Sequence, residues 1–256
     1  MKSWRGLLRK EWAQMKWRLV FFFLINNLIL FYGMDHLVFG VPEGLLTSIE
    51  PMIGLCFITH LIMAVSLLLE SLGKDIGRSD VWLHSPASMR QLVGAKFLLI
   101  VLSTSCSLVV SGMIAGISYF VGGGAVSVTD ELFLLLSVGV VILLNAIYVM
   151  ALVVFFWSIY QVFRSWIGLF SMVVIIIFIN IWIIGWGFVW STEVFQKVME
   201  MVPMYGSIQK LDLLMYNNYI VPSGSILTIG SLVLYGMLTV FYFVIGSMLF
   251  EKKVRL

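Results

Sequence analysis

Six apolar runs divide the sequence, and shorter polar or charged segments separate them. A membrane-spanning α-helix needs about 20 mostly apolar residues, and each run reaches that length. Several runs exceed the minimum, which allows the helices to tilt but fixes no angle. The sequence therefore predicts an all-α integral membrane protein with a single transmembrane domain, residues 1–256, of six spans. The predicted spans are 19–41, 51–72, 97–121, 132–160, 166–190 and 224–250.

The segment before the first span, residues 1–18, is amphipathic at helical spacing. It combines a Trp- and Leu-rich face with basic residues around the rest of the helix, as in helices that lie in the inner membrane interface against anionic headgroups. We expect membrane lipids as its partner. Its role is either plain anchoring or the transmission of motion. The apolar face comprises Trp4, Leu7, Leu8, Trp12 and Met15.

A strongly polar segment, residues 73–96, separates the second and third spans. Ser79 or Asp80 can cap a short helix, which Pro86 then breaks. A second helix, capped by Ser85, is expected to run from Pro86 into the third span. Trp82 and Leu83 would give the short helix an apolar contact surface; the alternative is a solvated loop. The candidate docking residues are Asp80, Val81, Trp82, Leu83, His84, Ser85, Pro86 and Arg90.

The longest segment outside the predicted spans, residues 191–223, shows two short amphipathic patterns with Pro203 between them. Val194, Val198 and Met201 share the face of the first pattern. Two short helices at the outer interface would satisfy the pattern, and so would a partial re-entrant hairpin. Such helices could cap an exit path or simply pack on the spans.

Composition and charge place the chain in a membrane and orient it. The sequence is 61% hydrophobic and 11% charged, whereas a soluble domain carries roughly 25% charged residues. With both termini in the cytoplasm, 14 of the 16 basic residues are internal, all except Lys197 and Lys210. That distribution follows the positive-inside rule, so we expect a multi-pass protein of the cell membrane. Because topology accounts for the positive charge, no nucleic-acid partner is expected.

Polar side chains within the predicted spans are candidates for lining a transport path, because polar groups at depth are costly. For His60 the alternative is a neutral ring that is hydrogen-bonded to a neighbouring helix. Glu70 lies near the inner end of the second span, where it can pair with Lys74 one turn later. The candidate path residues are Asn26, Asn27, His60, Asn145 and Asn180.

The sequence contains no recognisable catalytic, nucleotide or metal motif. There is no GxxxxGK[ST] phosphate loop, no HExxH and no GxSxG. The three histidines fall at different predicted depths, and Cys56 and Cys106 both lie within apolar runs, as buried thiols do. We therefore predict that the chain is not an enzyme and binds no cofactor or metal itself.

Two stretches carry a resemblance to a known family. LLRKEW at 7–12 is similar to the amphipathic "elbow" helix that precedes the first span in type-2 ABC transporter permeases. The stretch from Glu70 to Lys96, with LHSPASMRQLVGAK, resembles the family's coupling-helix region between spans two and three. It departs from the family's adjacent Ser-Arg, because Met89 separates Ser88 from Arg90. The elbow residues that the resemblance implies are Trp4, Leu8, Arg9, Lys10, Glu11 and Trp12.

The resemblance covers essentially the whole chain and implies a permease subunit of an ATP-driven exporter. Two ABC ATPase subunits, which carry ATP and Mg, would dock on the coupling helix, and a second permease subunit, identical or paralogous, would complete the path. A hydrophobic or amphipathic peptide, toxin, lipid or drug is the implied cargo. The size and the WLHSP loop resemble bacterial, Gram-positive exporters of amphipathic peptides. The alternative is an ion-coupled secondary transporter, which would want an acidic residue at mid-membrane and internal inverted repeats; neither is evident.

Overall fold

The computed structural model describes residues 2–40, 45–76, 88–121, 128–199, 201 and 228–254, and this part of the chain is almost entirely helical. The two longest helices are Lys2–Gly40, with 39 residues, and Val128–Ile167, with 40 residues. The elements are α1 (Lys2–Gly40), α2 (Leu45–Ile76), α4 (Met89–Val121), α5 (Val128–Ile167), the 3₁₀ turn η1 (Gly168–Phe170), α6 (Ser171–Trp190), α7 (Glu193–Met199) and α9 (Ile229–Val254).

Four helical stretches among the described residues are long and apolar enough to cross a membrane. One of them, 55 residues long, runs through α5, η1 and α6, and therefore covers two of the predicted spans. The coarse prediction of a helical protein with helices long and apolar enough to span a membrane is thus confirmed, and the exact count of six spans stays a prediction. The four stretches are Gly54–Lys74, Arg90–Ile114, Leu136–Trp190 and Ile229–Glu251.

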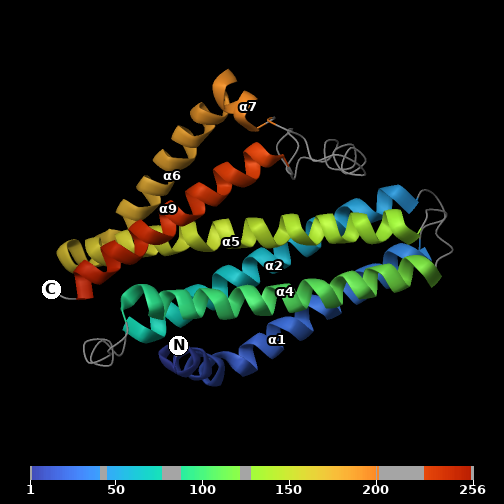
Figure 1. Cartoon of the computed structure of the whole chain (residues 1–256), viewed down its shortest axis with the longest axis horizontal. Coiled ribbons are helices and arrows are strands. Elements are labelled where there is room, and N and C mark those ends of the chain that lie inside the picture. Colours follow the sequence, from blue (N-terminus) through green and yellow to red (C-terminus); the bar gives the residue numbers. More distant parts are fainter. Residues whose placement is uncertain are drawn as a thin grey trace.

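The long helices run back and forth along one axis (Figure 1). α1, α2, α4 and α5 lie alongside one another, while α9 packs across α5 and α6 leans away from the other helices. Both ends of the chain lie at one end of the molecule, together with the end of α2, the start of α4 and the η1 turn. The start of α1 and the described start of α4, which belong to two of the stretches singled out in the sequence, both lie at this shared end.

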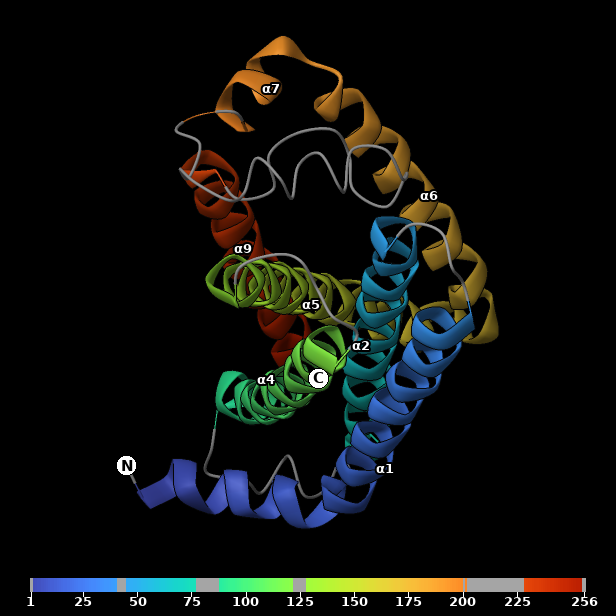
Figure 2. The ribbon, with the colours of Figure 1, turned by 90° about the vertical axis from the view of Figure 1, so that its right-hand side faces the viewer.

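α1 is continuous, whereas the sequence predicted an interfacial helix over 1–18 and a separate span over 19–41. No proline occurs before Pro42, so nothing removes a backbone donor and interrupts the helix. The first part of α1 nevertheless runs at a steep angle to the rest (Figure 2). The two predicted segments are thus parts of one helix that changes direction, and the assignment of 1–18 to the interface and 19–41 to a span stays a prediction.

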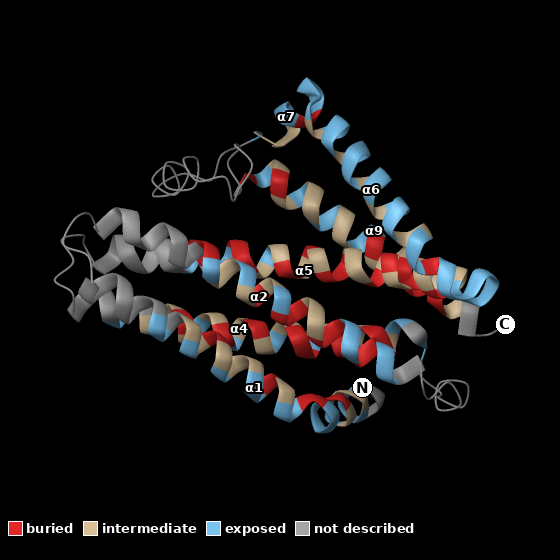
Figure 3. Cartoon of the chain, turned by 180° about the vertical axis from the view of Figure 1, so that it is seen from behind, coloured by how far each residue is buried: buried red, intermediate tan, exposed pale blue. Residues whose placement is uncertain are grey.

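The buried core joins α1, α2, α4, α5 and α9 near the shared end. Figure 3 shows buried residues concentrated on α2, α4 and α5, while α6 is exposed along most of its length. α5 and α9 approach closely at Gly246, where an added Cβ would lie 2.9 Å from the Cα atom of Phe155. Since lipid is as apolar as a leucine side chain, such close packing, rather than the hydrophobic effect, holds helices together in a bilayer.

An aromatic cluster attaches α6 to α5 and α9. Trp182 of α6 donates a hydrogen bond from Nε1 to the hydroxyl oxygen of Tyr242 on α9, at 3.1 Å. Phe156 of α5 packs edge-on against both Phe178 and Trp182 of α6. One side of α6 is therefore held by the rest of the molecule.

The turn between α5 and α6 lies later than expected. The sequence predicted spans ending at 160 and beginning at 166, but α5 continues to Ile167 and η1 follows. Gly168 takes φ +58°, a left-handed conformation that other residues rarely adopt, and it allows the chain to reverse there.

A short helix, α7, is present at the start of the segment for which the sequence predicted outer helices; its place on the outer side stays a prediction. Phe195 is buried there against the rings of Trp186 and Trp190. Val194, which the sequence placed on the apolar face, is 74% exposed. The second pattern of this segment lies outside the described residues.

Candidate functional site

A buried ion pair connects the first helix to α4 at the shared end of the molecule. The Nζ atom of Lys96 lies 2.6 Å from Oε2 of Glu11, and it also donates to Oγ of Ser71 on α2 at 2.8 Å. Lys96 is 0% exposed and Glu11 is 1% exposed. Three helices therefore meet at one lysine ammonium.

The burial of this pair demands the contacts that it makes. An isolated charge inside a protein costs far more free energy than one in water, so buried charges are paired or hydrogen-bonded. Lys96 meets that requirement through Glu11 and Ser71. The second carboxylate oxygen of Glu11, Oε1, is buried and has no hydrogen-bond partner within the part of the chain that the structure describes. The carboxylate therefore depends on Lys96 for its compensation.

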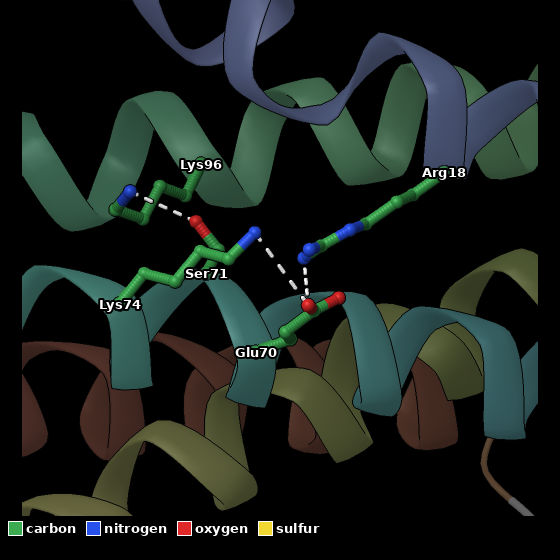
Figure 4. Close-up of polar contacts among 5 residues, drawn as sticks. All are labelled: Arg18, Glu70, Ser71, Lys74 and Lys96. Carbon is green, nitrogen blue, oxygen red and sulfur yellow. Dashed lines mark hydrogen bonds and ion pairs between the residues drawn. The ribbon is translucent and has the colours of Figure 1, made fainter.

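A second, more exposed set of charges lies beside Lys96 and Ser71 (Figure 4). Arg18 of α1 forms an ion pair with Glu70 of α2, and Lys74 lies 3.5 Å from the same Glu70 oxygen. The Glu70–Lys74 contact confirms the pairing that the sequence predicted. These side chains are 38–48% exposed, so solvent screens the attraction and each pair contributes little stability. We call the two sets together, Glu11, Arg18, Glu70, Ser71, Lys74 and Lys96, the polar junction.

Helical spacing explains how α1 reaches the junction. Leu7, Glu11, Met15 and Leu19 recur every four residues, and Glu11, Met15 and Leu19 are buried. Trp4, one turn before Leu7, lies over α4, where its Cη2 atom would be 3.3 Å from a Cβ atom added to Gly94. A glycine at this position leaves room for the indole ring.

The predicted elbow residues separate into two groups around α1. Glu11 faces inward, and Trp4 packs over Gly94. Trp12 is 51% exposed and points away from the core, although the sequence placed it on the same face as Met15. Arg9 is exposed, and Leu8 and Lys10 are half-buried.

Most of the predicted docking residues, Asp80 to Pro86, lie outside the described residues. Arg90 is exposed in the first turn of α4. The described helix begins at Met89, not at Pro86, and Ser88 caps it. The backbone N–H of Gln91 donates to Oγ of Ser88 at 3.4 Å, and the backbone N–H of Ser88 donates to Oε1 of Gln91 at 3.2 Å. This reciprocal capping box fixes the start, and from there α4 continues without a break through Lys96, as predicted.

A second polar layer ties the same three helices together deeper in the bundle. Asn26 of α1 donates to Sδ of Met63 on α2 at 3.1 Å. His60 of α2 lies with Nε2 3.1 Å from Oγ of Ser107 on α4. Ser111 of α4 donates to Oδ1 of Asn27 at 3.2 Å. For His60 the structure thus bears out the alternative reading, a ring hydrogen-bonded to a neighbouring helix.

The two layers share one register. From Ser71 back to His60 on α2, and from Lys96 on to Ser107 on α4, the distance is eleven residues in each case. Eleven residues are about three helical turns, or roughly 16 Å, so both contacts lie on the same face of each helix. α1 and α4 also share this register. Glu11 and Lys96 are 85 residues apart in sequence in the first layer, and Asn27 and Ser111 are 84 residues apart in the deeper layer. The three helices therefore form one clamped unit.

The remaining path candidates lie elsewhere. Asn145 is half-buried on α5, and its amide donates to the carbonyl of Val141 at 3.0 Å. Asn180 is exposed on α6 and donates to the carbonyl of Ile176 at 2.8 Å. The structure thus gathers Asn26, Asn27 and His60 but leaves these two apart, and a path lined by all five stays a prediction.

The sequence missed the Glu11–Lys96 and Arg18–Glu70 pairs. A signal for the first was present, because Glu11 is the one acidic residue in a basic segment and Lys96 directly precedes the apolar run of the third span. Within the described ranges no three His, Cys, Asp or Glu side chains lie close enough to hold a metal ion.

Comparisons with known proteins give no relative. No family model, no curated protein and no solved structure matches this chain. The polar junction is therefore interpreted from its own geometry.

Proposed function

We propose that this chain is the permease subunit of an ATP-driven exporter of the type-2 ABC kind. The observation that supports the proposal most is the contact between Glu11 and Lys96. These residues belong to LLRKEW and to the segment ending in VGAK, the two stretches on which the family resemblance rests. They are 85 residues apart in sequence, and they meet at the end of the molecule where α2 ends and α4 begins.

In this proposal residues 73–96 face the cytoplasm and dock on a separate ATPase. The chain has no phosphate-binding loop of its own, so the energy comes from that partner, which binds ATP and Mg. Two ATPase subunits and a second permease subunit complete the transporter. The protein has six spans and cytoplasmic termini in the cell membrane.

The polar junction transmits the movement. A push on the segment between α2 and α4 reaches Ser71 and Lys96, which lie five residues before the end of α2 and seven residues after the start of α4, and it passes to α1 through Glu11. Because the deeper layer around His60 keeps the same register, the three helices move together rather than slide past one another. Rearrangement of this clamped unit against α5, α6 and α9 opens the path for a hydrophobic or amphipathic cargo.

Docking is tested by capture of the ATPase on the tagged chain in mild detergent. We expect Trp82→Ala combined with Leu83→Ala to abolish capture while expression remains normal. A matched control is Trp166→Ala with Leu169→Ala, because this Trp and Leu are 80% and 87% exposed at the same end of the molecule. Equal ATPase capture by both double variants would contradict the docking claim.

One observation favours an ion-coupled transporter as the second candidate. Oε1 of Glu11 is buried without a hydrogen-bond partner in the described chain, and buried carboxylates serve as proton sites in carriers. In that case uptake or export would follow an ion gradient and need no ATPase. Transport by the purified chain alone in vesicles with a pH gradient, without ATP, would favour this candidate over the exporter.

A further inference from the structure

α6 carries an amide where a lipid-facing helix would be purely apolar. The helix has 20 residues, Ser171–Trp190, and is about 30 Å long, which matches the hydrocarbon thickness of a bilayer. Asn180 is the tenth residue, so it lies at the middle of the membrane. It is exposed.

The exposed position of Asn180 follows from the way α6 packs. Phe178 and Trp182 hold the helix against α5 and α9. Two residues along a helix correspond to a rotation of about 200°, so Asn180 points to the opposite side. The residues around it, which we call the Asn180 face, are exposed: Ile176, Ile177, Ile183, Ile184 and Gly187.

The internal hydrogen bond does not satisfy the amide of Asn180. One N–H donates to the carbonyl of Ile176. The side-chain oxygen has no partner in the described chain, and lipid tails offer none. Because unsatisfied polar groups in hydrocarbon are costly, side chains of this kind face other helices and bond across them.

We propose that the Asn180 face is where a second copy of this chain docks. Two copies inserted in the same orientation place Asn180 at the same depth, so each meets the other across a two-fold axis. An amide is self-complementary, because its N–H groups can donate to the oxygen of the second amide. An added Cβ at Gly187 would have no neighbour within 4 Å, so the face is open there and two α6 helices can approach closely.

This inference deepens the proposed function, which calls for a second permease subunit, by choosing an identical copy and naming its surface. It rests on the proposed function only for the expectation that a second permease subunit exists. The self-association of the purified chain is measured without any ATPase, so failure of one claim is distinguishable from failure of the other.

The first experiment measures the dimer fraction of the full chain in lipid nanodiscs by native mass spectrometry. We expect a dimer for the wild type and a loss of affinity of about 3- to 30-fold for Asn180→Leu. Asn180→Gln, which keeps an amide, should retain most of the affinity. Asn145→Leu is the matched control, because Asn145 makes the same bond to its own helix but is half-buried, and it should dimerise like the wild type.

The second experiment does not depend on the stability of the leucine variant. In a Cys106→Ala background, Asn180→Cys should form a disulfide-linked dimer under mild oxidation. Val240→Cys is the control, since Val240 is 63% exposed near the middle of α9. A monomeric wild type, a dimer that Asn180→Leu leaves unchanged, crosslinking at 240 but not at 180, or a complex whose mass requires a different protein would each overturn the proposal.

Discussion

The ammonium of Lys96 and the carboxylate of Glu11 lie 2.6 Å apart, and both side chains are buried between α1, α2 and α4. Ser71 supplies a further acceptor at 2.8 Å. This contact ties the amphipathic start of the chain to the helix that leads into the bundle. The predictions below test whether it holds the helices together and whether it transmits movement.

Breaking the buried pair from one side should be costly. Lys96→Met leaves the Glu11 carboxylate buried without compensation, so we expect a loss of about 3–5 kcal/mol of stability. Glu11→Met should cost a similar amount. The combined variant should lose much less than the sum of the two, because neither charge remains. Thermal unfolding in detergent measures all three, and additive losses would show that the two residues do not act as a pair.

The exposed pair should behave differently. Arg18→Ala removes a contact with Glu70 that solvent screens, so the expected loss is at most about 1 kcal/mol. Raising the salt concentration should weaken the wild-type contribution further. A loss for Arg18→Ala as large as that of Lys96→Met would contradict the difference in burial between the two pairs.

The close contact between α5 and α9 can be tested by adding a methyl group where the two helices meet. Gly246→Ala would place a Cβ atom 2.9 Å from the Cα atom of Phe155, so we expect about 1–3 kcal/mol of destabilisation. Gly236→Ala is the control on the same helix, because an added Cβ meets nothing within 4 Å there. It should be neutral or slightly stabilising. Thermal unfolding of the two variants side by side checks the difference.

The hydropathy pattern predicted much of the fold, because a spanning helix needs only a sufficient length of apolar residues. The stretches of α2, α4 and α9, and the near neighbours Glu70 and Lys74, follow directly from local sequence. Contacts between helices do not, since hydropathy carries no information about which faces meet. Arg18–Glu70 and Glu11–Lys96 were therefore missed.

Helix ends were predicted less well than helix interiors, for a physical reason. Ser85 with Pro86 and Ser88 with Gln91 are competing start signals only three residues apart. The structure uses Ser88 as the cap of the described helix, because its side chain and that of Gln91 satisfy each other's backbone donors. At the same end of the bundle, α5 passes the predicted end at residue 160 and turns only at Gly168, where a left-handed conformation is available.

The deeper polar layer should be structural. A double-mutant cycle with His60→Ala and Ser107→Ala should give a coupling energy of about 0.6 kcal/mol, the average for such bonds between membrane helices. Export should persist in His60→Ala if the ring only joins α2 to α4. A change in cargo preference in that variant, with folding intact, would instead place His60 on the path.

If the polar junction transmits movement, a change in it should lower export without lowering ATP hydrolysis. In the complex with its ATPase, Glu11→Gln should keep ATP hydrolysis but lower the export achieved per ATP, because α1 no longer follows α4. The neighbouring Gln14→Glu variant, at an exposed position of the same helix, is the control and should leave the ratio unchanged. An unchanged ratio in Glu11→Gln would show that α1 is an anchor only.

The central claim is that this chain works with a separate ATPase, and one measurement tests it most directly. The tagged chain is purified in mild detergent from its native membrane, and the eluate is assayed for ATP hydrolysis. The account predicts a co-eluting nucleotide-binding subunit whose activity is lost from the eluate when Trp82 and Leu83 are both replaced by alanine. A folded, pure chain without ATPase activity would contradict the account.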